Sequence, residues 1–86
     1  GWQNMLGSRA WATNYANSTG RSILVRITAA SKANSSVNFL LDGRTYLGAS
    51  ANLAGEQISN EILVPPGSVY AATGSIGAIY SWDELR

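Results

Sequence analysis

Side chains able to do acid–base chemistry are sparse in this chain of 86 residues. Its carboxylates are Asp42, Glu56, Glu61, Asp83 and Glu84. Asp42 is explained by a turn, and Asp83 and Glu84 are expected to be solvated at the end of the chain. Glu56 and Glu61 remain as a conceivable pair for cleaving a glycosidic bond, a reaction in which two carboxyl groups flank the bond. Because their spacing is odd, a continuous strand would place them on opposite faces, so we do not expect them to act together.

The residue types that nucleophilic or metal-dependent chemistry needs are equally scarce. The chain has no cysteine and no histidine, which removes disulfides, thiolate metal sites and the imidazole base. Lys32 is the remaining base for an activated serine, and no Ser-x-x-Lys pattern leads to it. The glycines match neither a phosphate loop nor a dinucleotide fingerprint, and the carboxylates are too dispersed for calcium. We therefore expect a protein that is not an enzyme and that holds no metal and no cofactor.

Aromatic side chains offer a different chemistry, which is recognition. An aromatic face stacks on the apolar C–H surface of a sugar ring while Asn, Asp or Arg side chains bond its hydroxyls. Tyr46, beside Arg44 and Asp42, suits this role best. Trp11 and Tyr15 form a second candidate set for ligand binding, and burial in the core or between subunits is the alternative for them.

Three further features have a structural and a functional interpretation. Trp82 is expected to pack rather than bind, and Trp2 to contact a neighbouring chain or a preceding domain. Asn17-Ser18-Thr19 matches the sequon for N-glycosylation, a weak three-residue signal. The run from Asn17 to Gly20 also predicts a turn, because Asn and Ser bond their own backbone and glycine tolerates positive φ.

Length and charge narrow the class of protein further. One core fits in 86 residues, so we expect a single domain over residues 1–86. A domain of this size buries only about 60–65% of the surface that its unfolded chain exposes, so it depends on staples or assembly. The net charge is +1 with basic residues spread singly, and no run approaches the roughly 20 apolar residues that span a bilayer. We expect neither nucleic-acid binding nor membrane insertion, and oligomerisation is the remaining source of stability.

The elements that position these residues are predicted to be strands. Side chains alternate in several short runs with the period of a strand, and two such runs flank Asp42-Gly43, a pair that favours the type I′ turn of a hairpin. A loop or weak edge is expected at 48–55, and 50–57 is the stretch able to hold a helical turn. The predicted strands are 8–16, 22–30, 37–41, 44–47, 58–64, 69–73 and 78–82. About seven short strands predict an all-β fold, a small antiparallel β-sandwich or jelly roll.

Three segments together resemble a known group of proteins. The first is the turn Tyr15-Ala16-Asn17-Ser18-Thr19-Gly20-Arg21 that enters an aliphatic strand, within residues 12–23. The second is Val64-Pro65-Pro66-Gly67-Ser68-Val69-Tyr70, and the third is the closing Ser81-Trp82-Asp83-Glu84-Leu85-Arg86. As a set they resemble the C-terminal domains of bacteriophage tail fibres and related prophage tail proteins.

The resemblance implies an assembly and a task. Domains of this family lie at the distal tip of a fibre on the virion, usually form a parallel homotrimer, and often bind a host-surface glycan or outer-membrane protein. It also implies that the chain is the C-terminal piece of a longer fibre protein. No receptor-contact motif of the family carries over, so Tyr46, Arg44, Asp42, Trp11 and Tyr15 rest on the aromatic argument alone.

Two alternatives stay open at this point. One is a structural trimerisation or capping module, and the other is a carbohydrate-binding module attached to an enzyme, which would be monomeric. A physical reason beside the resemblance favours the trimer. The run 22–30 carries isoleucines and a valine on one face and Leu24 on the other, more apolar surface than a thin sandwich covers. Burial against partners stabilises such surface by roughly 25 cal/mol per Å².

Overall fold

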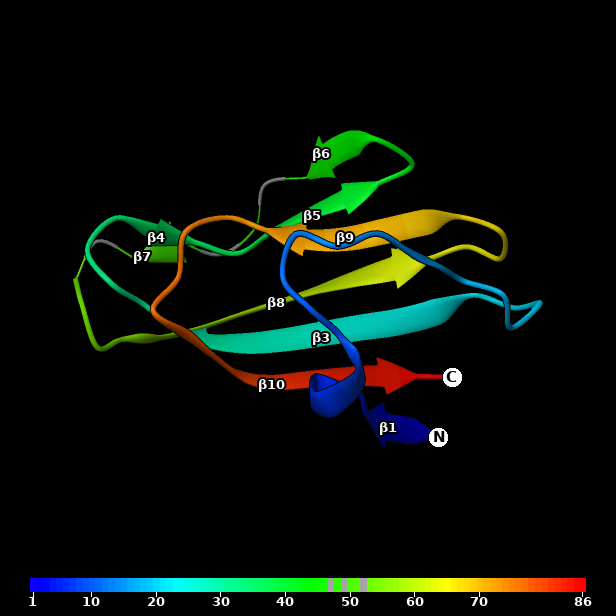
Figure 1. Ribbon diagram of the computed structural model, residues 1–86, viewed down its shortest axis with the longest axis horizontal. Coiled ribbons are helices and arrows are strands. Elements are labelled where there is room, and N and C mark those ends of the chain that lie inside the picture. Colours follow the sequence, from blue (N-terminus) through cyan, green and yellow to red (C-terminus); the bar gives the residue numbers. More distant parts are fainter. Residues whose placement is uncertain (47, 49, 52) are drawn as a thin grey trace.

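The computed structural model describes residues 1–46, 48, 50–51 and 53–86. Two four-stranded antiparallel sheets pack on each other, as Figure 1 shows, so the predicted small all-β sandwich is confirmed. The first sheet has the order β1-β10-β3-β8 and the second the order β2-β9-β5-β6, while β4 and β7 pair separately. The strands are β1 (Trp2–Asn4), β2 (Tyr15–Ala16), β3 (Ile23–Ala30), β4 (Ser35–Ser36), β5 (Asn38–Leu41), β6 (Arg44–Tyr46), β7 (Ser50–Ala51), β8 (Gln57–Val64), β9 (Val69–Thr73) and β10 (Ala78–Leu85).

The core forms where the alternating strands turn their apolar faces inward. Ile23, Val25 and Ile27 of β3 are fully buried, as their period of two predicts. Phe39 from β5 and Trp82 from β10 join them from the two sheets. The expected packing role of Trp82 is therefore confirmed. Each such side chain contributes about 1.5–3 kcal/mol when it leaves water.

The prediction of one strand over 8–16 is wrong. A short 3-10 helix covers Leu6–Ser8, and only the last two residues of the run form β2. Between them the backbone turns at Ala12, which has φ of 56° and donates its N–H to the carbonyl of Ala72 at 2.8 Å. Alanine has little preference for strands, and the alternating pattern arises here from large side chains that reach the core across a turn.

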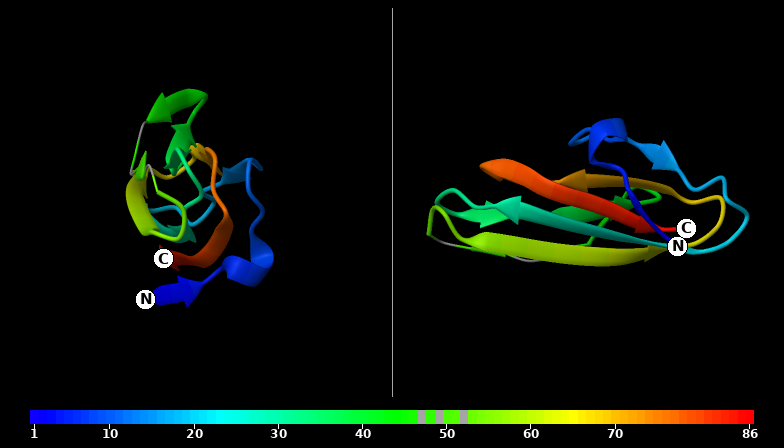
Figure 2. Two further views of the ribbon diagram at one scale, coloured as in Figure 1. Left: turned by 90° about the vertical axis from the view of Figure 1, so that its left-hand side faces the viewer. Right: turned by 90° about the horizontal axis from the view of Figure 1, so that it is seen from below.

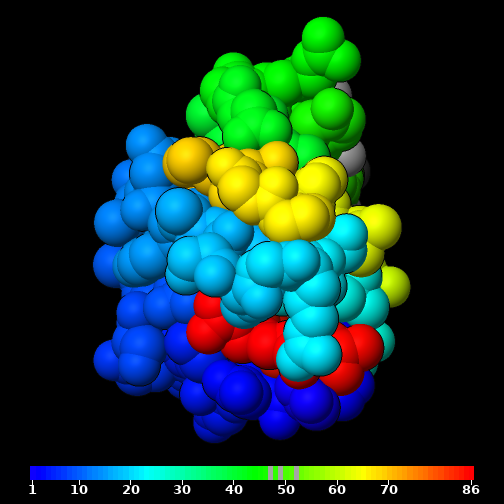
Figure 3. Space-filling view, turned by 90° about the vertical axis from the view of Figure 1, so that its right-hand side faces the viewer, coloured from blue at the N-terminus to red at the C-terminus, as the bar shows by residue number. Residues whose placement is uncertain are grey.

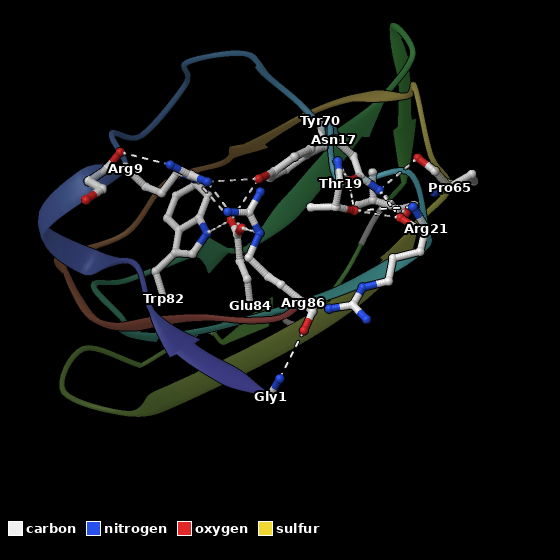
Figure 4. Close-up of polar contacts among 12 residues, drawn as sticks. Gly1, Arg9, Asn17, Thr19, Arg21, Pro65, Tyr70, Trp82, Glu84 and Arg86 are labelled. Carbon is white, nitrogen blue, oxygen red and sulfur yellow. Dashed lines mark hydrogen bonds and ion pairs between the residues drawn. The ribbon is translucent and has the colours of Figure 1, made fainter.

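The predicted turn before β3 is held by a buried asparagine. Asn17 is 1% exposed, and its amide donates to the carbonyls of Arg21 (2.7 Å), Val64 (3.0 Å) and Pro65 (3.1 Å). Its side-chain oxygen accepts bonds from Thr19, including the hydroxyl at 2.7 Å (Figure 4). Asn17 therefore ties the start of β3 to the end of β8. The side-chain amide of Asn17 is enclosed in the folded domain. The match of Asn17-Ser18-Thr19 to the sequon is therefore explained by this turn.

The hairpin predicted around Asp42-Gly43 is confirmed. Both turn residues have positive φ, 51° and 81°, as a type I′ turn requires. Strands β5 and β6 project beyond the rest of the sandwich in Figures 1 and 2, because β6 is an outer strand of its sheet. Leu47, the last residue of the predicted strand, lies outside the described residues.

The remaining predictions differ from the structure mainly in length. The weak edge expected within 48–55 contains β7, which pairs with β4. Strand β8 ends before Pro65, as expected of a residue that cannot donate to a ladder. Strand β10 runs three residues past Trp82, with a bulge between Ile79 and Ser81. Among the described residues, seven strands have three or more residues.

Asp42 gives the hairpin turn a pH-dependent contribution to stability. Its carboxylate accepts bonds from the N–H of Val69 (2.9 Å) and the hydroxyl of Ser68 (2.8 Å), which lower the pKa of Asp42. A lowered folded pKa contributes stability above the unfolded value, near 4, that is lost as pH falls through the folded pKa. We expect Asp42→Ala to lower the thermal unfolding midpoint at pH 7, and the gap to wild type to narrow in acid.

The matched control is Asp42→Asn. Asn-Gly also favours the type I′ turn, and the amide oxygen still accepts a bond, so this variant keeps the hairpin and loses the acid dependence. Circular dichroism melts at pH 7 and in acid measure both effects. A gap between wild type and Asp42→Ala that stays constant with pH would contradict the assignment.

Candidate functional site

Trp11 and Tyr15, the second candidate set for ligand binding, make contacts within the domain. The indole N–H of Trp11 donates to the carbonyl of Gly74 at 3.0 Å, and the Tyr15 hydroxyl accepts a bond from the N–H of Ala10 at 2.7 Å. The Tyr15 ring also meets Trp82 edge-on, with centroids 6.2 Å apart. These contacts account for both side chains as packing groups. They lie near β2, at the opposite edge of the sheet from β6.

The three hairpin candidates have separate environments. Asp42 is occupied by its bonds across the turn, whereas Arg44 and Tyr46 are exposed and lie two residues apart on β6. Their register partners on β5 are Leu41 and Phe39. Because Phe39 points into the core, Tyr46 shares the inward face of the sheet and lies where that face becomes open to solvent.

A groove of about 300 Å³ lies against Tyr46, which is 43% exposed. One wall comes from the hairpin and the other from the outer strand β8, past which the hairpin projects (Figure 2). Its volume is at the lower end of ligand pockets, which suits a single small ring. The lining residues are Phe39, Leu41, Tyr46, Asn60, Glu61, Ile62 and Leu63.

The polar groups of this groove are held in place by bonds to the sandwich. The Asn60 amide donates to the carbonyl of Val37 at 3.2 Å, and its oxygen accepts a bond from the N–H of Glu61 at 2.9 Å. The Glu61 carboxylate pairs with Arg26 at 3.0 Å. Sequence reasoning missed this wall. Its signal was Asn60 itself, a polar residue at an inward position between Ile58 and Ile62.

A second cluster of titratable groups surrounds Glu84, and it corrects the expectation that this residue is solvated. Glu84 is fully buried because β10 continues past Trp82 and places both side chains on the inner face. Its carboxylate accepts bonds from Arg9 (3.0 and 3.2 Å), the Tyr70 hydroxyl (2.8 Å) and the Trp82 indole (3.1 Å), as Figure 4 shows. Arg86 forms an ion pair with it at 3.3 Å, without the geometry of a hydrogen bond.

The groups around Glu84 form a structural network of ion pairs and hydrogen bonds. Burial raises the pKa of Tyr70 to about 12, and the adjacent Glu84 carboxylate adds to the effect, so the hydroxyl stays a donor at neutral pH. Burial would lower the pKa of Arg9, but its bonds to Glu84 and Tyr70 outweigh this and raise it. Its guanidinium also stacks on the Tyr15 ring, 4.5 Å from the centroid. Arg9, Tyr70 and Trp82 therefore satisfy the Glu84 carboxylate, whereas the buried Nε of Arg86 has a charge partner in Glu84 but no hydrogen bond.

Removing the charge of Glu84 is expected to be costly. In Glu84→Gln the guanidinium groups of Arg9 and Arg86 keep their charge with no carboxylate between them, so the free energy of unfolding falls by about 3–5 kcal/mol. The matched control is Glu61→Gln, which breaks the Arg26–Glu61 pair, whose side chains are both 49% exposed, and costs less than about 1 kcal/mol. Urea unfolding measures both. Equal losses would contradict the central role of Glu84.

The state of Tyr70 is directly measurable. Absorbance titration should resolve one tyrosine with a pKa of about 12, and Tyr70→Phe should remove it while Tyr80→Phe, at a 56% exposed position, leaves it. A raised folded pKa contributes stability that is complete below the unfolded value, about 10, and lost as pH rises to the folded one. Wild type should therefore lose stability relative to Tyr70→Phe between about pH 10 and 12. A single titration step near 10 for all tyrosines would refute this.

Two classes of site lack support in the part of the chain that the structure describes. Within 1–46, 48, 50–51 and 53–86, no three of the residue types His, Cys, Asp and Glu come together as metal ligands. In the same ranges no helix has the length and apolar character needed to cross a membrane. No family model matches this chain, and no curated protein or solved structure is detectably similar to it.

Proposed function

We propose that this domain is a non-catalytic recognition module that binds a bacterial surface glycan, as the distal tip of a phage tail fibre. The observation that carries the proposal is the groove between the projecting hairpin and β8. It combines an exposed aromatic face, Tyr46, with fixed polar groups on the facing strand. On this proposal the domain acts outside the cell, on the virion.

The groove has the chemical parts that a sugar requires. Tyr46 presents a ring for the C–H face of a pyranose, and the half-buried apolar side chains of Leu41 and Ile62 continue that surface. Asn60 and Glu61 stand opposite as partners for hydroxyl groups, and their existing bonds limit the entropy lost on binding. Arg44 lies two residues from Tyr46 on the same strand and is exposed, but it is not among the residues that line the groove.

Binding fits this groove better than hydrolysis does. Glu61 is the one carboxylate among its lining residues, and it is paired with Arg26. A glycosidase of the usual kind needs two carboxyl groups across the bond. Glu56, the partner considered from the sequence, precedes β8 and is not among the residues that line the groove.

The placement on a tail fibre rests on the three resembling segments, which contact one another in the fold. The first segment touches the second where Asn17 donates to the carbonyls of Val64 and Pro65. The second touches the third where the Tyr70 hydroxyl donates to Glu84. Segments that share contacts support one another as a signature of a single fold, rather than as three separate short matches.

Adsorption measurements test the proposal with a matched pair of tyrosines. Tyr46→Ala should weaken binding to a glycan array or to whole bacterial cells about tenfold, the loss expected for one aromatic stacking contact. Tyr80→Ala removes a tyrosine that is 56% exposed outside the groove and should bind as wild type does. Absence of binding by the folded wild-type domain to any bacterial surface, or equal binding by Tyr46→Ala, would count against recognition and favour a capping module.

A further inference from the structure

A second hollow lies on the outer side of β8, next to the groove beside Tyr46. Its volume is about 260 Å³, and its lining residues are Arg26, Ser59, Asn60 and Glu61. Asn60 and Glu61 line the groove as well, so the two hollows meet at β8 and share part of one wall. We call the second one the outer hollow.

The edge of the first sheet explains why one strand borders both hollows. Strand β8 is the outer strand of its sheet, so its backbone lies at the surface, between the two sides of the sheet. Ser59 and Glu61 are exposed on the outer side, whereas Asn60 between them faces inward. In Figure 3 the hairpin (green) stands above the rest of the domain, and residues around the end of β8 (yellow) lie below it. A ligand in the groove can therefore continue across this edge into the outer hollow.

The charged groups of the outer hollow are held in one arrangement. Nε of Arg26 donates to Oε2 of Glu61 at 3.0 Å, and the guanidinium stacks 4.6 Å from the centroid of the Trp2 ring. The terminal nitrogens of Arg26 and Oε1 of Glu61 take part in no hydrogen bond among the described residues, and both side chains are half exposed. Preformed donors thus lie beside a preformed acceptor, which limits the side-chain entropy lost when both meet a ligand.

Asn60 fixes the wall that the two hollows share. Besides its bonds to Val37 and Glu61, its amide lies against the backbone of Gly48. A Cβ at position 48 would overlap Nδ2 of Asn60 and the carbonyl oxygen of Val37, so only glycine allows this close approach. The side chain between the groove and the outer hollow therefore keeps one orientation.

We propose that the groove and the outer hollow are adjoining subsites for a neutral glycan of at least two sugar rings, an inference that rests on the proposed function. One ring stacks on Tyr46 in the groove. The next crosses the edge of β8 and meets Arg26, Ser59 and Glu61. The shared wall carries the inference, because two hollows of similar volume with lining residues in common place two rings close enough to belong to one chain.

The charges of the two subsites favour a glycan without charged substituents. Among the described residues that line the hollows, Arg26 and Glu61 are the charged ones, and they neutralise each other. A carboxylate or phosphate on the sugar would approach Glu61 while Arg26 is already paired, and an amine would meet Arg26 in the same way. Removing an uncompensated charge from water is costly. Hydroxyl groups both donate and accept, so they match the Arg26 nitrogens, the Glu61 oxygen and the Ser59 hydroxyl.

Binding to an array of defined sugars tests the second subsite. The probes are neutral hexose monosaccharides, the di- and trisaccharides built from them, and counterparts that carry a uronic acid, a phosphate or an amine. Wild type should bind a neutral oligosaccharide about tenfold more tightly than its component monosaccharides, the gain expected from one or two added hydrogen bonds. Equal affinity for the monosaccharides, or tighter binding of a charged counterpart, would overturn the proposal.

Two pairs of variants locate the effect in the outer hollow. Ser59→Ile fills this hollow and Arg26→Met removes its donors, and each should lose the preference for the oligosaccharide. Gln57→Ile, two residues along the same face of β8, and Arg21→Met, at an exposed arginine, are the controls. Both lie outside the two hollows and should keep the preference. Circular dichroism checks that each variant is folded.

The outcomes separate this inference from the proposed function. Binding that depends on Tyr46 but keeps its preference in Ser59→Ile and Arg26→Met would overturn the outer subsite and leave glycan recognition in place. Absence of binding to every sugar on the array would overturn both.

Discussion

The carboxylate of Glu84 joins parts of the chain that lie far apart in sequence. Its partners are Arg9 from the irregular N-terminal segment, Tyr70 from the second sheet, Trp82 from the first sheet, and Arg86 from directly after β10. A domain of 86 residues without cysteine has no disulfide to fix its sheets, so this cluster takes that place with directional bonds. A buried carboxylate is tolerated only with all its partners present, and the cluster therefore specifies how the two sheets and the first loop meet.

Local sequence patterns were sufficient for the parts of the fold in which strand period decides the structure. The alternation in β3 and the Asp42-Gly43 pair predicted a buried strand and a type I′ hairpin, because each depends on neighbouring residues alone. Residues 8–16 show the same alternation but do not form one strand. Arg9 instead bonds Glu84, which lies 75 residues away. Nothing local reports that pairing. Glu84 lies two residues from Trp82 on one strand, so the two side chains share a face. This indication of burial was outweighed by the position of Glu84 near the end of the chain.

The candidate site was predictable to the same extent. Tyr46 is recognisable as an aromatic residue on an exposed hairpin, but the wall that faces it belongs to the other sheet. Which strand lies opposite depends on how the sheets are offset, and that is set by core packing rather than by any one segment. Strand β8 consequently serves two surfaces: Val64 faces the core, whereas Ile62 and Leu63 line the groove.

The exposed residues of the projecting hairpin are less constrained by the packing of the domain than its interior is. Its exposed residues Arg44 and Tyr46 have no contact with the Glu84 cluster or the Asn17 turn among the hydrogen bonds and ion pairs of the described residues. Stability effects of distant, independent sites add with little coupling. Substitutions on β6 can therefore accumulate without drawing on the stability of the sandwich. The surface of the hairpin can therefore change its chemistry while the buried polar residues that fix the sandwich stay the same.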